Sequence, residues 1–593
     1  MAWYDNAVFY HIYPLGLTGA PLQNPYREPV HRLNTLIPWI DHISDLGCSA
    51  LYIGPLFESV GHGYETTDYR KVDSRLGTNE DLKAFVAQCH RKGIRVILDG
   101  VFNHVGRDFF AFQDLKKNRE NSPYRDWFCN VNFWNNNEYN DGFSYDNWGG
   151  YNLLVKLNQR NPEVQTYLCD SIRMWVSEFD IDGLRLDAAD VLDFGFMQTL
   201  SALAREVKNE FWLMGEVIHG DYTRWVNSNM LNSVTDYNLH KALYSGVNDH
   251  NFFEIAHTVK RIYDMGLNRP GGMKLYSFVD NHDVERIYTK LQEKANFTPV
   301  HILLFTLPGI PSIYYGSEFA IEGRKERGSD ASLRPALNLD DYSEALTRNP
   351  YTALIKALAH LRRSCPPLQD GDYRELVLTT KQYAFARTLN GSSVLTAVNN
   401  ENAPAQIRIP AEDGKHYTGV LSGQKITVSG GILECSLEGN SGEVWVPDEA
   451  GYTEAVPLQA IAAQSPAKKE TAQKKADMSA AKESPAPESA PAPAPASTPA
   501  PESAPAQASA PAQSPAKKET AQKASEKKAE TKSTEKKAAP IPRDKSYEEM
   551  TVEELQSVIL EKLAKNGPVT DRMRKDVEDN IWHDSLVTWA RSF

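Results

Sequence analysis

The chain has 593 residues, of which 41% are hydrophobic and 10% aromatic, so it can form several domains around a large buried core. Its formal net charge of -13 argues against nucleic acid or an anionic membrane as a partner of the main body. The N-terminus lacks the pattern of a signal peptide, and no apolar run approaches the roughly 18 residues of a membrane-spanning helix. The six scattered cysteines are typical of buried free thiols in a reducing compartment, and we expect a cytoplasmic protein.

The first hundred residues alternate apolar strands with amphipathic helices. Strand-like runs at 7–13, 49–54 and 94–99 are separated by helical patterns at 35–46 and 79–92. This alternation predicts βαβ units and a parallel sheet.

The same alternation resumes after residue 160 and supplies five more strands. The expected helices are 162–179, 194–208, 252–264, 296–305 and 350–364, and the expected strands are 183–187, 211–216, 233–236, 275–280 and 312–315. Eight strands with helices between most of them predict a (β/α)8 TIM barrel of residues 1–104 and 161–365.

Three further regions follow from composition. Residues 105–160 are rich in Asn, Asp, Tyr and Trp and predict a small inserted domain after the third strand. Residues 366–455 carry short β-like runs between turn residues and predict a C-terminal antiparallel β-sandwich. Residues 456–545 consist mostly of Ala, Pro, Lys, Glu, Ser, Thr and Gln and predict a disordered linker, which is most often a plain spacer.

Residues 546–593 regain helical periodicity. A capping box is predicted from Thr551 to Glu554, before a helix that ends at Asn566, and a second helix is predicted over 571–592. We interpret the segment as a helical docking module for a protein partner or for self-association.

Carboxylates follow four of the predicted strands. Asp99 ends the third strand, Asp187 the fourth, Glu216 the fifth, and Asp283 follows the seventh. The C-terminal ends of barrel strands share one rim, so we expect these side chains to meet there. Each one alone could cap a helix or form a structural ion pair, as Arg185 and Asp187 could, but four at one rim favour an active site.

These segments resemble the four signature regions of the α-amylase family of retaining glycoside hydrolases. The matching segments are Asp99 to His104, Gly183 to Asp187, Gly215-Glu216 and Phe278 to Asp283. The resemblance covers about residues 5–450 and implies a TIM barrel that cleaves α-glucosidic bonds in oligosaccharides.

The resemblance implies three catalytic roles. Asp187 is expected to be the nucleophile, Glu216 the general acid/base and Asp283 the stabiliser of the transition state. Arg185 should favour the ionised form of Asp187, and neighbouring acids should raise the pKa of Glu216. Asp99 is expected to hold Arg185 in place.

The resemblance also implies substrate contacts. Tyr64 would form a stacking platform, His104 and His282 would bind sugar hydroxyls, and Asp330 with Arg334 would serve a neighbouring subsite. The expected substrate-binding residues are Tyr64, His104, Arg185, His282, Asp330 and Arg334.

Substrate and metal expectations rest on finer matches. Leu154 to Asn158 resembles the fifth region of the neopullulanase and cyclomaltodextrinase group, although Val155 replaces its usual proline and no N-terminal β domain precedes the barrel. In the stretch after the second strand, Glu65 follows Tyr64 where the family more often has Asp. Ala189-Asp190 follows the nucleophile where calcium-binding amylases have Lys-His, so no cofactor is expected, and calcium is left as the disfavoured alternative.

Several functions stay open at this point. The leading hypothesis is hydrolysis of α-1,4 bonds in maltodextrins or cyclodextrins, with α-1,6 bonds as a further candidate. A glucanotransferase would use the same covalent intermediate. A non-catalytic carbohydrate-binding or scaffold protein would use the same barrel, but the intact Asp187, Glu216 and Asp283 argue against it.

Overall fold

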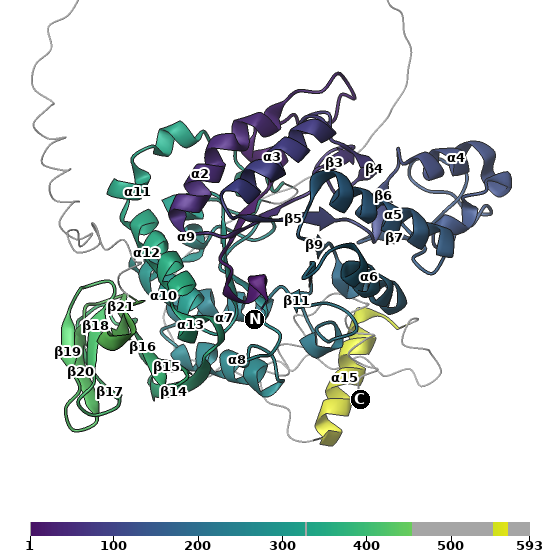
Figure 1. Ribbon diagram of the computed structural model, residues 1–593. Coiled ribbons are helices and arrows are strands. Elements are labelled where there is room, and N and C mark those ends of the chain that lie inside the picture. The colour runs from purple at the N-terminus through teal and green to yellow at the C-terminus, as the bar shows by residue number, and fades with distance from the viewer. Residues whose placement is uncertain (1, 327–328, 453–549, 567–593) are drawn as a thin grey trace, which may run out of the picture. The chain divides into compact units, whose positions relative to one another are not determined.

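The central sheet of the protein is a closed parallel barrel. The computed structural model describes residues 2–326, 329–452 and 550–566. Eight parallel strands form one sheet in the order β11-β10-β9-β5-β2-β1-β13-β12, and a parallel bridge between Thr235 and Tyr276 joins its two ends (Figure 1). This confirms the predicted TIM barrel. The barrel strands are β1 (Phe9–Ile12), β2 (Ala50–Ile53), β5 (Arg95–Gly100), β9 (Gly183–Leu186), β10 (Trp212–Gly215), β11 (Ser233–Val234), β12 (Tyr276–Phe278) and β13 (Ile310–Tyr314).

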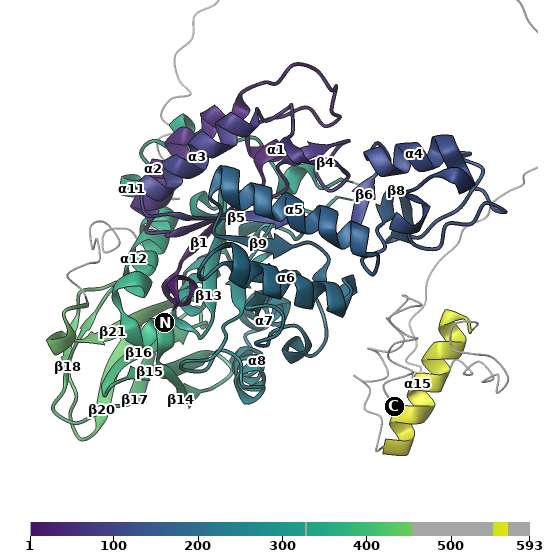
Figure 2. The same ribbon diagram turned by 45° about the vertical axis from the view of Figure 1, so that its right-hand side comes forward.

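Helices cover the outside of this barrel, and Figure 2 shows α5 and α6 side by side along it. The longer helices are α2 (Ile37–Leu46), α3 (Asn79–Arg91), α5 (Pro162–Phe179), α6 (Phe194–Val207), α7 (Tyr237–Asn248), α8 (Phe252–Asp264), α10 (Phe297–Thr306) and α12 (Pro350–Ser364). The shorter helices are α1 (Pro14–Leu17), α9 (Ile287–Lys290), α11 (Ala345–Arg348) and α13 (Pro366–Asp370).

Local sequence signals account for several helix ends. Thr78 caps α3, because its hydroxyl accepts from the Asp81 backbone while the Asp81 carboxylate accepts from the Thr78 backbone at 2.8 Å. Gly47 ends α2 in the left-handed conformation, with φ +96°. Helix α7 was not predicted, although Asp236 caps it by accepting from the Leu239 backbone at 3.0 Å.

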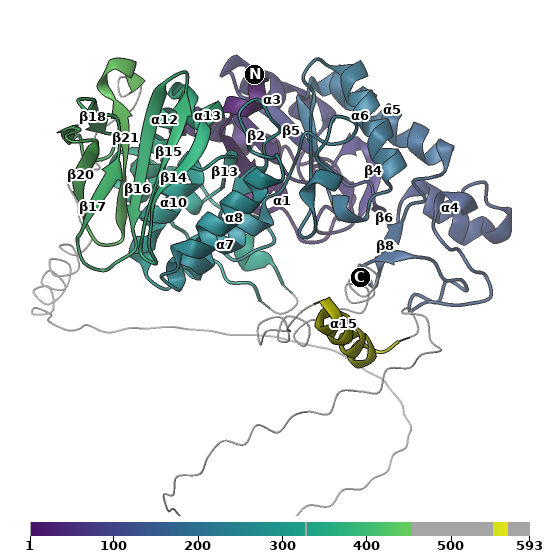
Figure 3. The same cartoon turned by 90° about the horizontal axis from the view of Figure 1, so that it is seen from below.

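The segment after the third barrel strand contains its own small sheet. Strands β6 (His104–Gly106), β8 (Tyr151–Lys156) and β7 (Asn147–Trp148) are antiparallel in that order, next to helix α4 (Phe110–Asn118). A separate hairpin of β3 (Phe57–Ser59) and β4 (Thr66–Val72) precedes it in the chain. Figures 1 and 3 show the inserted segment and the C-terminal sheet on opposite sides of the barrel.

The C-terminal region is the predicted antiparallel structure of two packed sheets. A six-stranded sheet has the order β14-β15-β16-β21-β18-β19, and β17 pairs with β20. One face of the large sheet, with Ala384, Leu395 and Trp445, packs with Ile407 and Leu433 of the small sheet. The strands are β14 (Asp372–Leu378), β15 (Gln382–Leu389), β16 (Ser392–Asn399), β17 (Ala405–Pro410), β18 (His416–Gly419), β19 (Lys425–Thr427), β20 (Ile432–Leu437) and β21 (Ser441–Pro447).

The other face of the large sheet continues the core of the barrel, chiefly along α10. Arg387 of β15 is buried and donates from Nη1 to the Thr306 carbonyl at 2.9 Å. The Asn400 amide donates to Asn296 Oδ1 at 2.7 Å. A Cβ atom added at Gly442 would lie 2.9 Å from Ile302 Cδ1, so the sheet and α10 are in close contact there.

The remaining described residues form helix α15 (Val552–Asn566), which ends where the sequence predicts. Its capping box is confirmed, because the Thr551 backbone donates to Glu554 Oε2 at 2.8 Å and the Glu554 backbone donates to the Thr551 hydroxyl at 3.3 Å. The predicted linker of 456–545 and the second terminal helix of 571–592 lie outside the described residues.

The described residues bear on two expectations, that the cysteines are buried free thiols and that no helix spans a membrane. All six cysteines are free, five are buried, and Cys129 is half-buried. None of the helices described is long and apolar enough to cross a membrane.

Candidate active site

Four strand ends of the barrel bring the predicted carboxylates together. Residues 185 and 187 lie two apart along β9 and its end, so their side chains project to the same side. The Asp187 backbone donates to the Gly100 carbonyl at 3.1 Å, and the Glu216 backbone donates to the Leu186 carbonyl at 2.9 Å. The ends of β5, β9 and β10 are therefore level with one another at the rim.

Arg185 is the centre of this cluster. Its side chain is 3% exposed, and its Nη1 atom lies 2.9 Å from Asp99 Oδ1 and 2.8 Å from Asp187 Oδ1. Its Nη2 atom lies 2.7 Å from Glu216 Oε2. One guanidinium group thus contacts three carboxylates, which fits the expected support by Asp99 and adds a contact to Glu216 that sequence reasoning missed.

Burial controls the protonation of these acids. It raises the pKa of Asp187 and of Glu216, and Arg185 opposes both rises. The charge of Asp283 raises the pKa of Glu216 further, as expected, but burial is the larger cause. Arg185 lowers the pKa of Asp187, as expected, although burial is again the larger influence on this carboxyl group. The charge of Glu216 also raises the pKa of Asp187, so an ionised Glu216 makes Asp187 hold its proton more tightly.

Asp283 stands at the side of the site, where Arg334 fixes it. Arg334 Nη2 lies 2.7 Å from Asp283 Oδ1 and 3.2 Å from Asp330 Oδ2, and its Nε donates to the His282 carbonyl at 2.9 Å. The Asp283 side chain is 32% exposed, compared with 11% for Asp187 and 14% for Glu216. Asp283 is therefore the most accessible of the three acids.

Both predicted histidines lie in the cluster in their neutral form. His104 Nε2 lies 4.0 Å from Asp187 Oδ2, and burial lowers the pKa of His104 to about 3. Among the described residues this Nε2 atom is buried without a hydrogen-bond partner. His282 Nε2 lies 3.0 Å from Asp283 Oδ2, and burial also lowers the pKa of His282. A neutral imidazole can donate one N–H hydrogen bond to a ligand oxygen.

Tyr64 completes one wall of the site. Its hydroxyl donates to Asp99 Oδ2 at 3.2 Å, and its ring is nearly parallel to that of His282, with 5.7 Å between the ring centroids. Tyr13 stacks on His282 at a similar distance of 5.8 Å.

Sequence reasoning missed His11, Tyr13 and Tyr52 as parts of this site. His11 of β1 stacks on Tyr52 of β2 at 4.2 Å, and the Tyr52 hydroxyl donates to Asp99 Oδ2 at 2.9 Å. The sequence feature that could have identified them is the period-two alternation of these buried strands. Every second side chain of such a strand points into the barrel.

Two of the finer sequence matches lie close to this cluster. Lys156, within the stretch that resembles the fifth family region, pairs with His104 across β8 and β6. Glu65 is buried, and its Oε1 atom lies 3.1 Å from His62 Nε2.

No set of three His, Cys, Asp or Glu side chains that could hold a metal ion occurs among the described residues.

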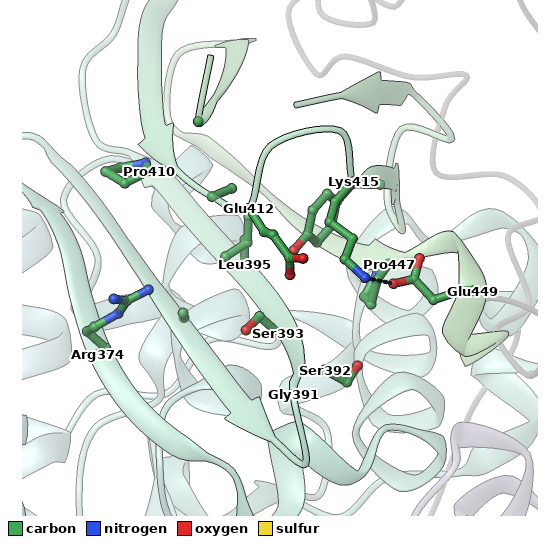
Figure 4. Close-up of a pocket in the computed structure, with 14 residues that line it drawn as sticks. Arg374, Gly391, Ser392, Ser393, Leu395, Pro410, Glu412, Lys415, Pro447 and Glu449 are labelled. Atoms are coloured by element: carbon green, nitrogen blue, oxygen red, sulfur yellow. Dashed lines mark hydrogen bonds and ion pairs between the residues drawn. The ribbon is translucent and has the colours of Figure 1, made fainter. Parts of the chain in front are cut away.

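A separate cavity of about 400 Å³ lies in the C-terminal region (Figure 4). All of its lining residues fall between Arg374 and Glu449, and Lys415 pairs with Glu449 at 2.8 Å. The cavity contains none of the rim carboxylates, so it is distinct from the candidate active site.

Comparisons with known proteins agree with this geometry. The family model for the alpha amylase catalytic domain matches residues 30–352. A cyclomaltodextrinase from Geobacillus thermopakistaniensis is 30% identical over 459 residues, which cover 73% of this chain and 76% of the relative. Neopullulanase 2 from Thermoactinomyces vulgaris is 29% identical over 474 residues, covering 74% and 78%. The solved debranching enzyme of Nostoc punctiforme has a TM-score of 0.63 and 26% identity, covering 75% of this chain and 98% of its own. The chain therefore belongs to the α-amylase family of glycoside hydrolases.

Proposed function

We propose that the protein hydrolyses α-1,4-glucosidic bonds in maltodextrins and cyclodextrins by double displacement, and that it accepts α-1,6 bonds as well. The contact of Arg185 with both Asp187 and Glu216 supports this proposal most directly. It brings the two acids against one guanidinium group, which favours the short carboxylate spacing, about 5–5.5 Å, of retaining enzymes.

In the first step, ionised Asp187 attacks the anomeric carbon while protonated Glu216 gives its proton to the glycosidic oxygen. The bond between the anomeric carbon and that oxygen breaks, and a glucosyl ester forms on Asp187. Contact with Arg185 favours the ionised form of Asp187, and the charge of Asp283 favours the protonated form of Glu216, which supports this division of roles.

In the second step, the now ionised Glu216 takes a proton from water as the water oxygen attacks the anomeric carbon. The ester bond breaks, Asp187 leaves as a carboxylate, and Glu216 is protonated again. The sugar keeps its anomeric configuration because it is inverted twice.

The surrounding residues bind and orient the sugar in this scheme. His104 and His282 are neutral and are proposed to donate hydrogen bonds to sugar hydroxyls. Tyr64 is proposed as the stacking platform, and Asp283 as the stabiliser of positive charge at the anomeric centre. Arg334 and Asp330 are proposed to serve the neighbouring subsite.

The substrate class follows from the relatives. Cyclomaltodextrinases and a neopullulanase are among them, and a maltogenic alpha-amylase of Bacillus acidopullulyticus is 33% identical over 389 residues. A cytoplasmic location is also part of the proposal, and an intracellular maltogenic amylase of Bacillus subtilis is among the relatives at 29% identity.

Two further parts of the proposal concern a metal and a protein partner. The carboxylate chemistry is proposed to need no resident metal, which is supported by Ala189-Asp190 after the nucleophile and is checked by activity in EDTA. Asn103 Oδ1 is buried without a hydrogen-bond partner among the described residues, and it is the first atom to examine if EDTA inactivates the enzyme. The C-terminal segment that includes α15 is proposed to bind a protein partner or a second copy of the chain.

The function is tested by incubating the pure protein with maltoheptaose, β-cyclodextrin and pullulan and separating the products by chromatography. Shorter sugars alone support hydrolysis. Products longer than the substrate would identify a glucanotransferase. No change in any substrate would contradict the proposal and favour a carbohydrate-binding role.

A further inference from the structure

Two exposed aromatic side chains stand at the tip of the β7–β8 hairpin in the inserted segment. Trp148 is 40% exposed and Tyr151 is 64% exposed. Gly149 and Gly150 separate them, with φ of +62° and +84°, a conformation that side chains with a Cβ atom disfavour. A tight turn therefore joins the two residues at one hairpin tip, since Trp148 pairs with Tyr151 across it.

Hydrogen bonds behind the turn hold this tip in place. Asn147 donates from Nδ2 to Asn152 Oδ1 at 2.7 Å, and the Tyr145 hydroxyl donates to the Asn152 carbonyl at 2.8 Å. Arg107 in turn donates to the Tyr145 hydroxyl at 2.6 Å. These hydrogen bonds hold the hairpin that carries Trp148 and Tyr151 in one conformation. Less conformational entropy is therefore lost when a ligand binds there.

The hairpin tip also lies close to the candidate active site, through contacts made by His104. The Trp148 ring centroid lies 5.9 Å from that of His104, with the planes at 41°. His104 Nε2 lies 4.0 Å from Asp187 Oδ2. His104 therefore lies close both to Trp148 and to the proposed nucleophile.

We propose that Trp148, on the same hairpin tip as Tyr151, forms a stacking surface for a glucosyl unit beyond the one attacked by Asp187, and that this surface makes the enzyme favour longer glucans over shorter ones. The inference rests on the proposed function. A pyranose ring presents apolar C–H faces and polar edges. It can therefore cover an exposed aromatic ring while its hydroxyls stay in water or meet the neighbouring asparagines.

The test compares Trp148→Ala and Trp148→Phe with the wild type on substrates of different length. Trp148→Ala should lower kcat/KM for maltoheptaose about tenfold, mainly through KM, and change that for maltose, which has no unit beyond the two at the scissile bond, about twofold or less. Trp148→Phe should restore most of the loss, because it keeps an aromatic face. Trp134→Ala is the matched control, since Trp134 lies in the same segment and is 96% exposed.

An equal loss on maltose and maltoheptaose would overturn the inference, and so would no loss on either. A binding measurement separates this outcome from failure of the proposed function. In the Asp187→Asn background, calorimetry should show that Trp148→Ala weakens maltoheptaose binding about tenfold, whether or not the wild type hydrolyses it. Unchanged maltoheptaose affinity in that background would also overturn the inference.

Discussion

The Nη2 atom of Arg185 lies 2.7 Å from Glu216 Oε2. The residue that contacts the proposed nucleophile therefore also contacts the proposed acid, and its positive charge favours the ionised form of both. Burial works in the opposite direction on each acid. The protonation of the site is decided by this balance, not by a single ion pair.

Asp187→Asn should abolish turnover while leaving the fold unchanged. Loss of a covalent nucleophile should lower kcat by several orders of magnitude. Loss of one hydrogen bond would cost only about 1 kcal/mol of stabilisation, which is a much smaller effect on the rate. Initial rates on maltoheptaose and circular dichroism of the variant check this. Retention of more than a tenth of wild-type activity would remove Asp187 from the nucleophile role.

Arg185→Lys should lower kcat by about 100-fold or more, because one ammonium group cannot contact three carboxylates in the same fixed geometry. Arg95→Lys is the matched control. Arg95 lies on the neighbouring strand β5 and pairs with Asp182, but its side chain is 47% exposed. Kinetics of both variants at one pH test the expectation, and equal effects would show that Arg185 is only structural.

Glu216→Gln should stabilise the fold at neutral pH. The pKa of Glu216 is raised in the folded state, so the folded protein binds its proton more tightly than the unfolded chain does. The stability from this group is present below the unfolded pKa and is lost as pH rises through the folded pKa. The variant should therefore gain about 2 °C in Tm at pH 7 and gain little at pH 4. A larger gain at pH 4 than at pH 7 would contradict the raised pKa.

The same group should set the alkaline limb of the wild-type rate profile. Because Glu216 must be protonated to act as the acid, kcat/KM should fall as pH rises through its raised pKa. The midpoint of that fall is expected above the ordinary glutamate value of about 4.3.

The first product of hydrolysis should carry the α configuration. Asp187 and Glu216 contact the same guanidinium group, which favours the retaining geometry. Proton NMR within the first minutes of reaction distinguishes the anomers before they interconvert. An initial β product would exclude double displacement.

Truncation after residue 452 should leave the rate on a soluble maltodextrin within about twofold, a change below roughly 0.5 kcal/mol in the barrier. All of the proposed site residues lie between His11 and Arg334, so the chemistry has no need of the later segment. Kinetics of the truncated enzyme check this. A loss of most activity would mean that the C-terminal segment contributes to the active site.

The barrel was predictable from sequence because each strand is a short buried apolar run and most are followed by an amphipathic helix. Helix α7 was missed because Ser245 and Gly246 interrupt its pattern, while tertiary packing of Leu239 and Leu243 stabilises it. Strand ends could be predicted to share a rim, since parallel barrel strands all end there.

The contacts across the rim could not be derived in the same way. His11 and Tyr52 belong to two different strands, and their stacking depends on the register of β1 with β2. The contact of Arg185 with Glu216 depends likewise on the side-chain geometry of two separate strands. Neither the register nor that geometry is encoded by a local pattern.

The close contact between the C-terminal sheet and α10 limits how this enzyme can be engineered. A side chain at position 442 would collide with Ile302 of α10, so only glycine fits there. Arg387 of the sheet donates a hydrogen bond to the Thr306 carbonyl of α10. The sheet cannot be exchanged as a cassette without exposing apolar surface and removing the hydrogen-bond donor of the Thr306 carbonyl. A working chimera would have to transfer α10 together with the sheet, and the intact enzyme should melt in one calorimetric transition across both.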